Sequence, residues 1–244
     1  MLKAVTFDLW GTLITEKPEG TRWTKAERIR RIDEVLRSEQ ITMDPEAIGH
    51  AYATVGERLV VLWETLRDIG ARAQVEWLLD IVQIGKSAPR SESMMERLVE
   101  AYTHPILLEL PVLIDGASDV LATLDARGLR LALICNTGRT PGKILRIILE
   151  RLNLSKHLSV QIFSDEFGLR KPRPEIFEHT LAALGVKQQE ALHVGDTLAS
   201  DITGALALGM RAVHFCHARG ADPYPAEGQT ISSLPELLSL IDHG

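Results

Sequence analysis

Several acidic, basic and amide side chains in this chain follow directly after short runs of apolar or β-branched residues. The clearest case is Val5-Thr6-Phe7, which leads into Asp8 and then into a Gly-Thr turn that includes Thr12. An Asp at the end of a buried strand serves as a nucleophile, as a metal ligand, or only as a turn or helix cap. Asp8 alone does not distinguish these roles, so the other strand-like segments must decide between them.

Polar residues also follow other apolar segments, or open the helices after them. They are Cys135, Asn136, Thr137 and Gly138, then Lys171, and then Asp196 and Asp201. Parallel strands end at one edge of a sheet, so we expect these side chains to converge with Asp8. Two carboxylates, Asp8 and Asp196, suit Mg²⁺, which keeps waters and a phosphate oxygen as its other ligands. Lys171 would offset negative charge, and the turn amides before the next helix would donate to phosphate oxygens.

Five apolar runs alternate with segments of helical period, which predicts an α/β fold with a parallel sheet and right-handed crossovers. The predicted strands are residues 3–9, 129–136, 159–163, 191–195 and 211–216. The expected helices between them end at Gly128, Gly185 and Gly209, and a short helix is expected near 234–241. The predicted core is therefore a Rossmann-like doubly wound parallel sheet.

One long block, residues 16–108, shows helical periodicity only. Asp44 before Pro45 is a typical helix start, because an N-cap side chain is followed by a proline that needs no hydrogen-bond partner. Apolar residues then recur at spacings of three and four, as in a packed helical bundle. We predict that residues 1–15 and 109–244 form the core and that residues 16–108 form an inserted all-helical cap domain.

The composition is that of a globular protein and argues against nucleic-acid and membrane partners. The 244 residues are 45% hydrophobic and 25% charged, with a formal net charge of −6. A nucleic-acid partner would require a basic face, and Arg28, Arg30 and Arg31 lie among acids, as on a solvated helix face. No apolar run approaches the roughly 18 residues of a membrane span, and Asp8 interrupts the apolar run at the N-terminus. Both cysteines, Cys135 and Cys216, lie in strand-like segments, so we expect buried thiols and a cytoplasmic protein.

Taken in order, these motifs resemble the haloacid dehalogenase superfamily of hydrolases over essentially the whole chain. The matching segments are Asp8-Leu9-Trp10-Gly11-Thr12, the end of the second strand at Cys135 to Gly138, Gly168-Leu169-Arg170-Lys171-Pro172, and Gly195-Asp196-Thr197-Leu198-Ala199-Ser200-Asp201. Each motif alone is weak, because a Gly-Asp pair is common. The helical insert is similar to the cap that closes over the site in this family and selects the substrate.

The resemblance implies a role for each matched residue. Asp8 is the expected nucleophile, forming an aspartyl intermediate that water hydrolyses, and Lys171 is the second expected catalytic residue. The expected substrate- and phosphate-binding residues are Thr12, Cys135, Asn136, Thr137 and Gly138. The implied Mg²⁺ ligands are Asp8, the backbone carbonyl of Trp10, Asp196 and Asp201. Asp201 would bind through water or orient Lys171. The implied activity is that of a Mg²⁺-dependent phosphatase acting on a small anionic metabolite.

Two residues depart from the phosphatase pattern. Phosphatases of the family carry a second Asp where this chain has Trp10, and that Asp protonates the leaving group and later activates water. A positioned acid or base is typically worth roughly 10²–10⁴ in rate. Cys135 stands where the family usually has Ser or Thr, and a thiol is a weaker donor. We therefore expect a preference for good leaving groups, such as acyl or aryl phosphates.

These departures leave other functions open. Trp10 favours a 2-haloacid dehalogenase, but such enzymes work without metal and replace the Asp pair that this chain retains, and Arg22, Arg58 and Arg67 are only candidates for their cap arginine. A non-catalytic binding or regulatory protein is a third possibility. Carbon–phosphorus cleavage through a cap lysine, with Lys17, Lys25 or Lys86 available, is a fourth.

The residues that select the substrate are the least predictable part of the chain. Five cap residues could line a pocket or fill the bundle core: Trp23, His50, Tyr52, Trp63 and Trp77. We interpret them mainly as core residues. The oligomeric state, monomer or homodimer, stays open, because an apolar face of the cap that the core does not cover would form a dimer interface.

Overall fold

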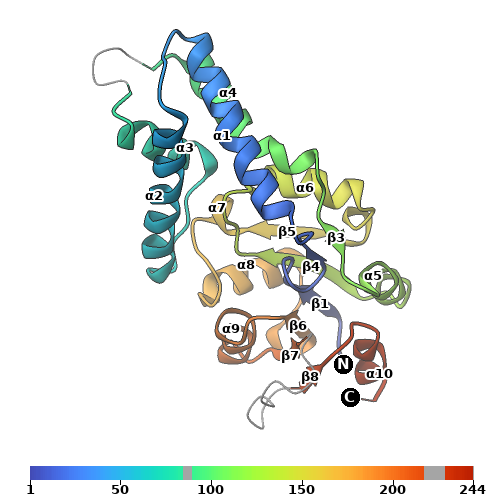
Figure 1. The fold of residues 1–244 in the computed structure, drawn as a ribbon. Coiled ribbons are helices and arrows are strands. Elements are labelled where there is room, and N and C mark those ends of the chain that lie inside the picture. The colour runs from blue at the N-terminus through green and yellow to red at the C-terminus, as the bar shows by residue number, and fades with distance from the viewer. Residues whose placement is uncertain (85–89, 217–228, 244) are drawn as a thin grey trace.

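The computed structural model describes residues 1–84, 90–216 and 229–243 of the chain (Figure 1). Six strands in these ranges form one sheet in the order β5-β4-β1-β6-β7-β8, and every neighbouring pair is parallel. The strands are β1 (Ala4–Phe7), β4 (Arg130–Cys135), β5 (Val160–Phe163), β6 (Ala191–Gly195), β7 (Arg211–Phe215) and β8 (Gln229–Ile231). The predicted α/β class and all five predicted strands are confirmed.

Strand β8 was not predicted from the sequence. Its three residues, Gln229 to Ile231, pair with Val213 to Phe215, and two of them are exposed. Such a short edge strand carries no apolar alternation, so periodicity does not reveal it.

Helices cover both faces of the sheet, and strand alternation gives each face its own core. Leu131, Leu133 and Cys135 of β4 face one core with α5 (Ala117–Ala126), α6 (Gly142–Arg151) and α10 (Glu236–His243). Ala132 and Ile134 face the other core with α8 (Pro174–Leu184) and α9 (Thr203–Ala207). A strand buried on both faces is typical of doubly wound sheets.

The inserted block folds as four helices with a core of their own, standing to one side of the sheet in Figure 1. They are α1 (Gly20–Ser38), α2 (Pro45–Glu64), α3 (Ala71–Ile81) and α4 (Glu92–Thr103). The predicted cap of α2 is confirmed, since the Asp44 side chain accepts a hydrogen bond from the Glu46 amide at 2.9 Å. None of the helices in the described part of the chain is both long and apolar enough to cross a membrane.

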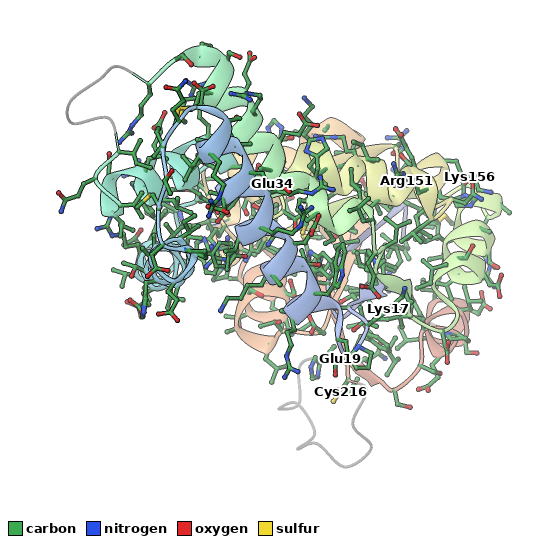
Figure 2. The ribbon with its side chains drawn as sticks, turned by 45° about the horizontal axis from the view of Figure 1, so that its top comes forward. Lys17, Glu19, Glu34, Arg151, Lys156 and Cys216 are labelled. Carbon is green, nitrogen blue, oxygen red and sulfur yellow. The ribbon has the colours of Figure 1, made fainter. Side chains whose placement is uncertain are left out.

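Two connecting segments join the helical block to the sheet. Short antiparallel strands, β2 (Ile14–Thr15) and β3 (Val112–Leu113), pair with each other where the chain leaves and returns, and η1 (His104–Leu107) precedes β3. Lys17, labelled in Figure 2 near the start of α1, forms an ion pair with Glu109 at 3.6 Å. The two connections are therefore held side by side.

Two expectations from the sequence are wrong in detail. Arg28 does not lie on a solvated helix face, because it is buried on the same side of α1 as Thr24, Ile32 and Leu36. Only Arg30 and Arg31 of that cluster form ion pairs with the neighbouring acids. Cys135 is buried as expected, whereas Cys216 is partly exposed and follows the end of β7.

Candidate active site

Four polar side chains converge at one edge of the sheet: Asp8 and Asp196 follow β1 and β6, Asp201 lies in the turn of helix after β6, and Lys171 lies in the loop before α8. The Nζ atom of Lys171 lies 2.6 Å from Oδ1 of Asp8 and 2.7 Å from Oδ1 of Asp201. All three side chains are buried, and that of Lys171 is 1% exposed. Asp196 completes the group, because ligand atoms of Asp8, Asp196 and Asp201 all lie within 4.8 Å of one another.

The sheet topology explains this convergence. Strand β1 lies between β4 and β6, so the chain runs outward from it in both directions. Phe7 is paired with Leu133 on one side and Val194 on the other, which brings the residues after these strands to one edge. Such a switch point is where open α/β sheets bind their ligands.

The loop after β1 approaches the acidic cluster closely. Gly11 adopts a φ of 77°, and a Cβ atom there would lie 2.2 Å from Oδ2 of Asp196. Gly195 is equally constrained, since a Cβ atom would lie 2.4 Å from Cγ of Asp201. Glycine is therefore required at both positions for the loops to close around the carboxylates.

The Lys171 backbone is fixed by Asn136. The Asn136 amide donates to the Lys171 carbonyl at 3.0 Å and accepts from the Lys171 amide at 2.8 Å. The side chain of this predicted phosphate-binding residue therefore positions the lysine in the present conformation.

Asp201 is held from behind by a hydrogen-bonded chain. His193 Nε2 lies 3.4 Å from Asp201 Oδ1, and His193 Nδ1 lies 2.8 Å from the hydroxyl of Thr6. The Thr197 amide donates to Asp201 Oδ2 at 3.0 Å, at the start of η4 (Leu198–Ile202). These contacts leave the Asp201 carboxylate little freedom to turn away from Lys171.

The pKa values of the two carboxylates that contact Lys171 are shifted in opposite directions. Burial raises the pKa of Asp8 to about 7, although the ammonium of Lys171 opposes this shift. Burial also acts to raise the pKa of Asp201, but Lys171 and His193 outweigh it and hold that pKa below its usual range. The two carboxylates outweigh the effect of burial on Lys171 and raise its pKa, so the lysine is charged. A bound divalent cation would favour the ionised form of Asp8.

Three oxygen donors in such proximity suit a hard divalent cation. Asp8 and Asp201 are buried and Asp196 is partly buried, and burial raises the pKa of Asp196 as well. The described atoms in this cluster include no thiolate or imidazole that would favour a softer metal. The donor set therefore fits Mg²⁺.

The other predicted site residues lie around this centre in different states. The Thr12 hydroxyl is buried and has no hydrogen-bond partner among the described residues. Cys135 is buried, and burial raises the pKa of its thiol, which stays neutral. Trp10 is partly buried and packs against the core while also lining a cavity. A buried hydroxyl without a partner is available to accept or donate a hydrogen bond to a ligand.

A loop of the helical block contacts the core through Asp68, which sequence reasoning missed. The Asp68 carboxylate accepts hydrogen bonds from Ser164 at 2.5 Å, from the Thr137 hydroxyl at 3.2 Å and from Arg170. The Thr137 amide donates to Ser164 Oγ at 2.7 Å. The Thr137 amide, predicted to bind phosphate, is thus occupied in this conformation.

A cavity of about 540 Å³ lies between the helical block and the core. Its wall includes Trp10 and the segment Asn136 to Thr140 from the core, and Arg28, Tyr52 and Trp63 from the helices. Asp8 itself is not among the lining residues, but the loops that follow β1 and β4 are represented by Trp10 and Asn136. Tyr52, Trp63 and Trp77 pack in the helical core as interpreted from the sequence, and Tyr52 and Trp63 also line the cavity. The core interpretation is wrong for Trp23 and His50, which are exposed.

The profile of the haloacid dehalogenase-like hydrolases matches residues 2–209, nearly the whole chain. The chain belongs to this family. It is 32% identical to a glyceraldehyde 3-phosphate phosphatase from Pyrococcus abyssi, with 100% of this chain and 95% of that protein covered. It is 30% identical to a ribulose-1,5-bisphosphate 5-phosphatase from Halopiger xanaduensis, with 99% of each covered.

A structural comparison supports the fold of this hydrolase. A 2-haloacid dehalogenase from Pseudomonas syringae pv. Tomato DC3000 superposes with a TM-score of 0.71 over 100% of this chain and 99% of that one, at 21% identity. At that identity the likeness concerns the fold alone. The contact between Asp8 and Lys171 is a feature of this chain's own structure.

Proposed function

We propose that this hydrolase is a Mg²⁺-dependent phosphatase that transfers the phosphoryl group of a small phosphorylated metabolite to Asp8. The carrying observation is the cluster of Asp8, Asp196 and Asp201 around the buried ammonium of Lys171. Three carboxylates and one lysine leave a negative excess, which a divalent cation would balance. The phosphatase names of the two relatives support the same reaction class.

Each residue then has a defined task. A carboxylate oxygen of Asp8 attacks phosphorus, the bond from phosphorus to the ester oxygen breaks, and an acyl phosphate on Asp8 is left. Water then attacks this phosphorus, which returns Asp8 and releases inorganic phosphate. Asp8, Asp196, Asp201 and the Trp10 carbonyl would hold Mg²⁺, which when bound neutralises charge on the phosphoryl oxygens. Lys171 keeps Asp8 oriented and Asn136 keeps Lys171 in place.

Trp10 sets the expected limits of this activity. It cannot donate a proton to the leaving oxygen, so esters whose leaving groups need no proton are favoured. The helical block, residues 16–108, is proposed to act as the cap that encloses the substrate, because its Asp68 loop and its cavity residues lie against the core.

A 2-haloacid dehalogenase is the second candidate, and Trp10 is the observation that favours it. A halide leaves without a proton, so the missing acid would cost nothing in that reaction. The acidic cluster argues against this alternative, because the single ammonium of Lys171 does not balance three neighbouring carboxylates, which repel one another without a further cation.

One panel separates these candidates. Release of phosphate from p-nitrophenyl phosphate, acyl phosphates and sugar phosphates is measured beside release of halide from 2-haloacids, each with Mg²⁺ and with EDTA. We expect phosphate release with Mg²⁺, its loss with EDTA, and its loss in the Asp8→Asn variant. Halide release that persists in EDTA would overturn the proposal in favour of the dehalogenase. Binding of phosphate esters without any turnover would instead support a regulatory protein.

The lysine-dependent alternative has little support in the described part of the chain. Lys17 is paired with Glu109, and only Lys25 lines the cavity. Lys86 lies outside the described residues.

A further inference from the structure

Two arginines beside the cavity lack a carboxylate partner among the described residues. Arg28, on α1, is 6% exposed, and its hydrogen bonds go to the Tyr52 hydroxyl at 3.1 Å and to the Thr140 hydroxyl at 2.9 Å. Its Nε atom is buried without a partner. Neither Arg28 nor Arg139 forms an ion pair with any described acid.

Arg139 is surrounded by equally neutral groups. It donates to the Tyr102 hydroxyl at 2.8 Å and to the Tyr52 carbonyl at 2.9 Å, and its guanidinium stacks 3.7 Å from the centre of the Tyr52 ring. Arg28 lies 5.7 Å from the centre of the Tyr102 ring. The two tyrosines therefore hold both guanidinium groups in fixed orientations without neutralising them.

An unpaired guanidinium at a buried position is unfavourable for the folded protein. Burying a cation without a counter-ion costs several kcal/mol, so buried arginines are normally paired. Arg170, on the same cavity wall, follows that rule and is paired with Asp68. Arg28 breaks this rule, the partly buried Arg139 beside it is likewise unpaired among the described residues, and the exposed Glu16 is the acid that shares their cavity wall.

The cavity connects this cationic pair to the catalytic edge. Arg28, Tyr52 and Arg139 share one wall with Trp10 and Asn136. Trp10 is two residues after Asp8 in the chain, and Asn136 directly follows Cys135. A molecule that fills the cavity would therefore meet the loops of the acidic cluster and the two arginines together.

We propose that Arg28 and Arg139 bind a second anionic group of the substrate, a carboxylate or a second phosphate, distinct from the phosphoryl group that Asp8 receives. The inference rests on the proposed function for the position of the transferred phosphoryl group. It defines the substrate class as phosphate monoesters with an oxyanion at the far end. The guanidinium groups suit this role, since they bind carboxylate and phosphate oxygens with paired hydrogen bonds.

The test compares ligands that differ only at the far end. Phosphoglycolate, which ends in a carboxylate, is paired with hydroxyethyl phosphate, and ribulose bisphosphate is paired with ribulose monophosphate. Dissociation constants are measured by calorimetry with Mg²⁺ in the Asp8→Asn protein, so that no turnover intervenes. We expect the doubly anionic member of at least one pair to bind roughly tenfold more tightly or better. The pair that shows this gain identifies the second group.

The arginines are tested in the same background. Arg28→Gln and Arg139→Gln should each weaken the doubly anionic ligand roughly tenfold and change the singly anionic one less than about twofold. Arg30→Gln, on the exposed face of α1, is the matched control and should change neither. If Arg28→Gln does not fold, Arg139→Gln alone decides.

The outcomes separate this inference from the proposed function. Equal weakening of both members of a pair, or no discrimination by the parent protein in either pair, overturns the second anionic site. Discrimination that depends on the arginines, with no phosphate released by the catalytically intact protein, would sink the proposed function and keep the binding site.

Discussion

Two charged regions of this molecule, one buried and the other in part buried, differ in how their charges are paired. At the sheet edge, Lys171 contacts the carboxylates of Asp8 and Asp201 directly, so its charge is compensated without any ligand. At the cavity wall, Arg28 and Arg139 contact only hydroxyls, a carbonyl and aromatic rings. Arg28 is as buried as the residues at the sheet edge and Arg139 is partly buried. The opposite pairing fits our proposal that the first region is organised before the substrate arrives and that the substrate completes the second.

The two regions also lie in different parts of the fold. The compensated region lies on strand ends whose register is fixed by backbone pairing. The uncompensated region joins α1 of the helical block to the loop before α6. A site shared between an inserted block and the core is where a ligand would hold the two together.

The largest expected effect comes from removing the compensating lysine. Lys171→Met leaves two buried carboxylates without their cation, and we expect a loss of roughly 3–5 kcal/mol of stability in the presence of chelator, with no detectable phosphate release. Arg28→Met, measured by the same urea unfolding, should lose at most about 1–2 kcal/mol, since only two hydroxyls lose a donor and an unpaired charge is removed. Equal losses of stability in the two variants would show that Lys171 and Arg28 do not differ in how their charges are compensated.

The deficit of Lys171→Met should also depend on pH. The pKa of Asp8 is already raised to about 7, so the folded protein takes up a proton at Asp8 as the pH falls through that value. Protonation removes one of the unpaired charges. The deficit should therefore shrink between pH 8 and pH 5, and a deficit that is independent of pH would show that lost packing is its cause.

A smaller effect is expected at Trp10, which is two residues after Asp8 and lines the cavity with Arg28 and Arg139. Trp10→Asp supplies a carboxyl group that can protonate the leaving oxygen, and we expect kcat for alkyl phosphates to rise by roughly 10²-fold. The rate with p-nitrophenyl phosphate should change little, because that leaving group needs no proton. Trp10→Asn, which cannot transfer a proton but opens the same space, is the control. A gain in both variants would assign the effect to access rather than acid catalysis.

The sequence alone predicted the compensated region better than the uncompensated one, for a physical reason. Asp8, Lys171, Asp196 and Asp201 each lie next to a strand end or helix start that local patterns reveal, and parallel pairing then forces them together. The same logic predicted five of the strands but could not detect β8, whose three residues have no periodicity.

Arg28 shows where local patterns mislead. Its acidic neighbours, Glu27 and Glu34, suggest a solvated face, yet Arg28 lies at a spacing of four from Thr24 and Ile32, on the buried side of α1. That spacing was visible in the sequence and was the only signal available. Asp68 had none, because a loop between two helices carries no pattern that tells which distant surface it will contact.

The smallest expected effect concerns Asp165, which, like Arg28, is a charged residue with no ion-pair partner among the described residues. It accepts hydrogen bonds from the Gly142 amide at the start of α6, at 3.1 and 3.3 Å, and forms no ion pair with a described cation. Burial raises its pKa to about 6. A raised carboxyl pKa means that the folded protein is favoured at low pH and that this stability is lost as the pH rises through about 6.

Asp165→Asn should therefore stabilise the protein at pH 8 more than at pH 5, since the amide oxygen still accepts from Gly142 and carries no charge to bury. Each kcal/mol recovered corresponds to about 2–4 °C in Tm for a protein of this size. Thermal unfolding of both proteins at the two pH values gives the comparison, and Asp119→Asn, an exposed acid in the first turn of α5, is the control. Because Asp165 is only partly buried, its gain at pH 8 should stay well below the loss expected for Lys171→Met. A gain of the same size at pH 5 would show that the charge of Asp165 is not the cause.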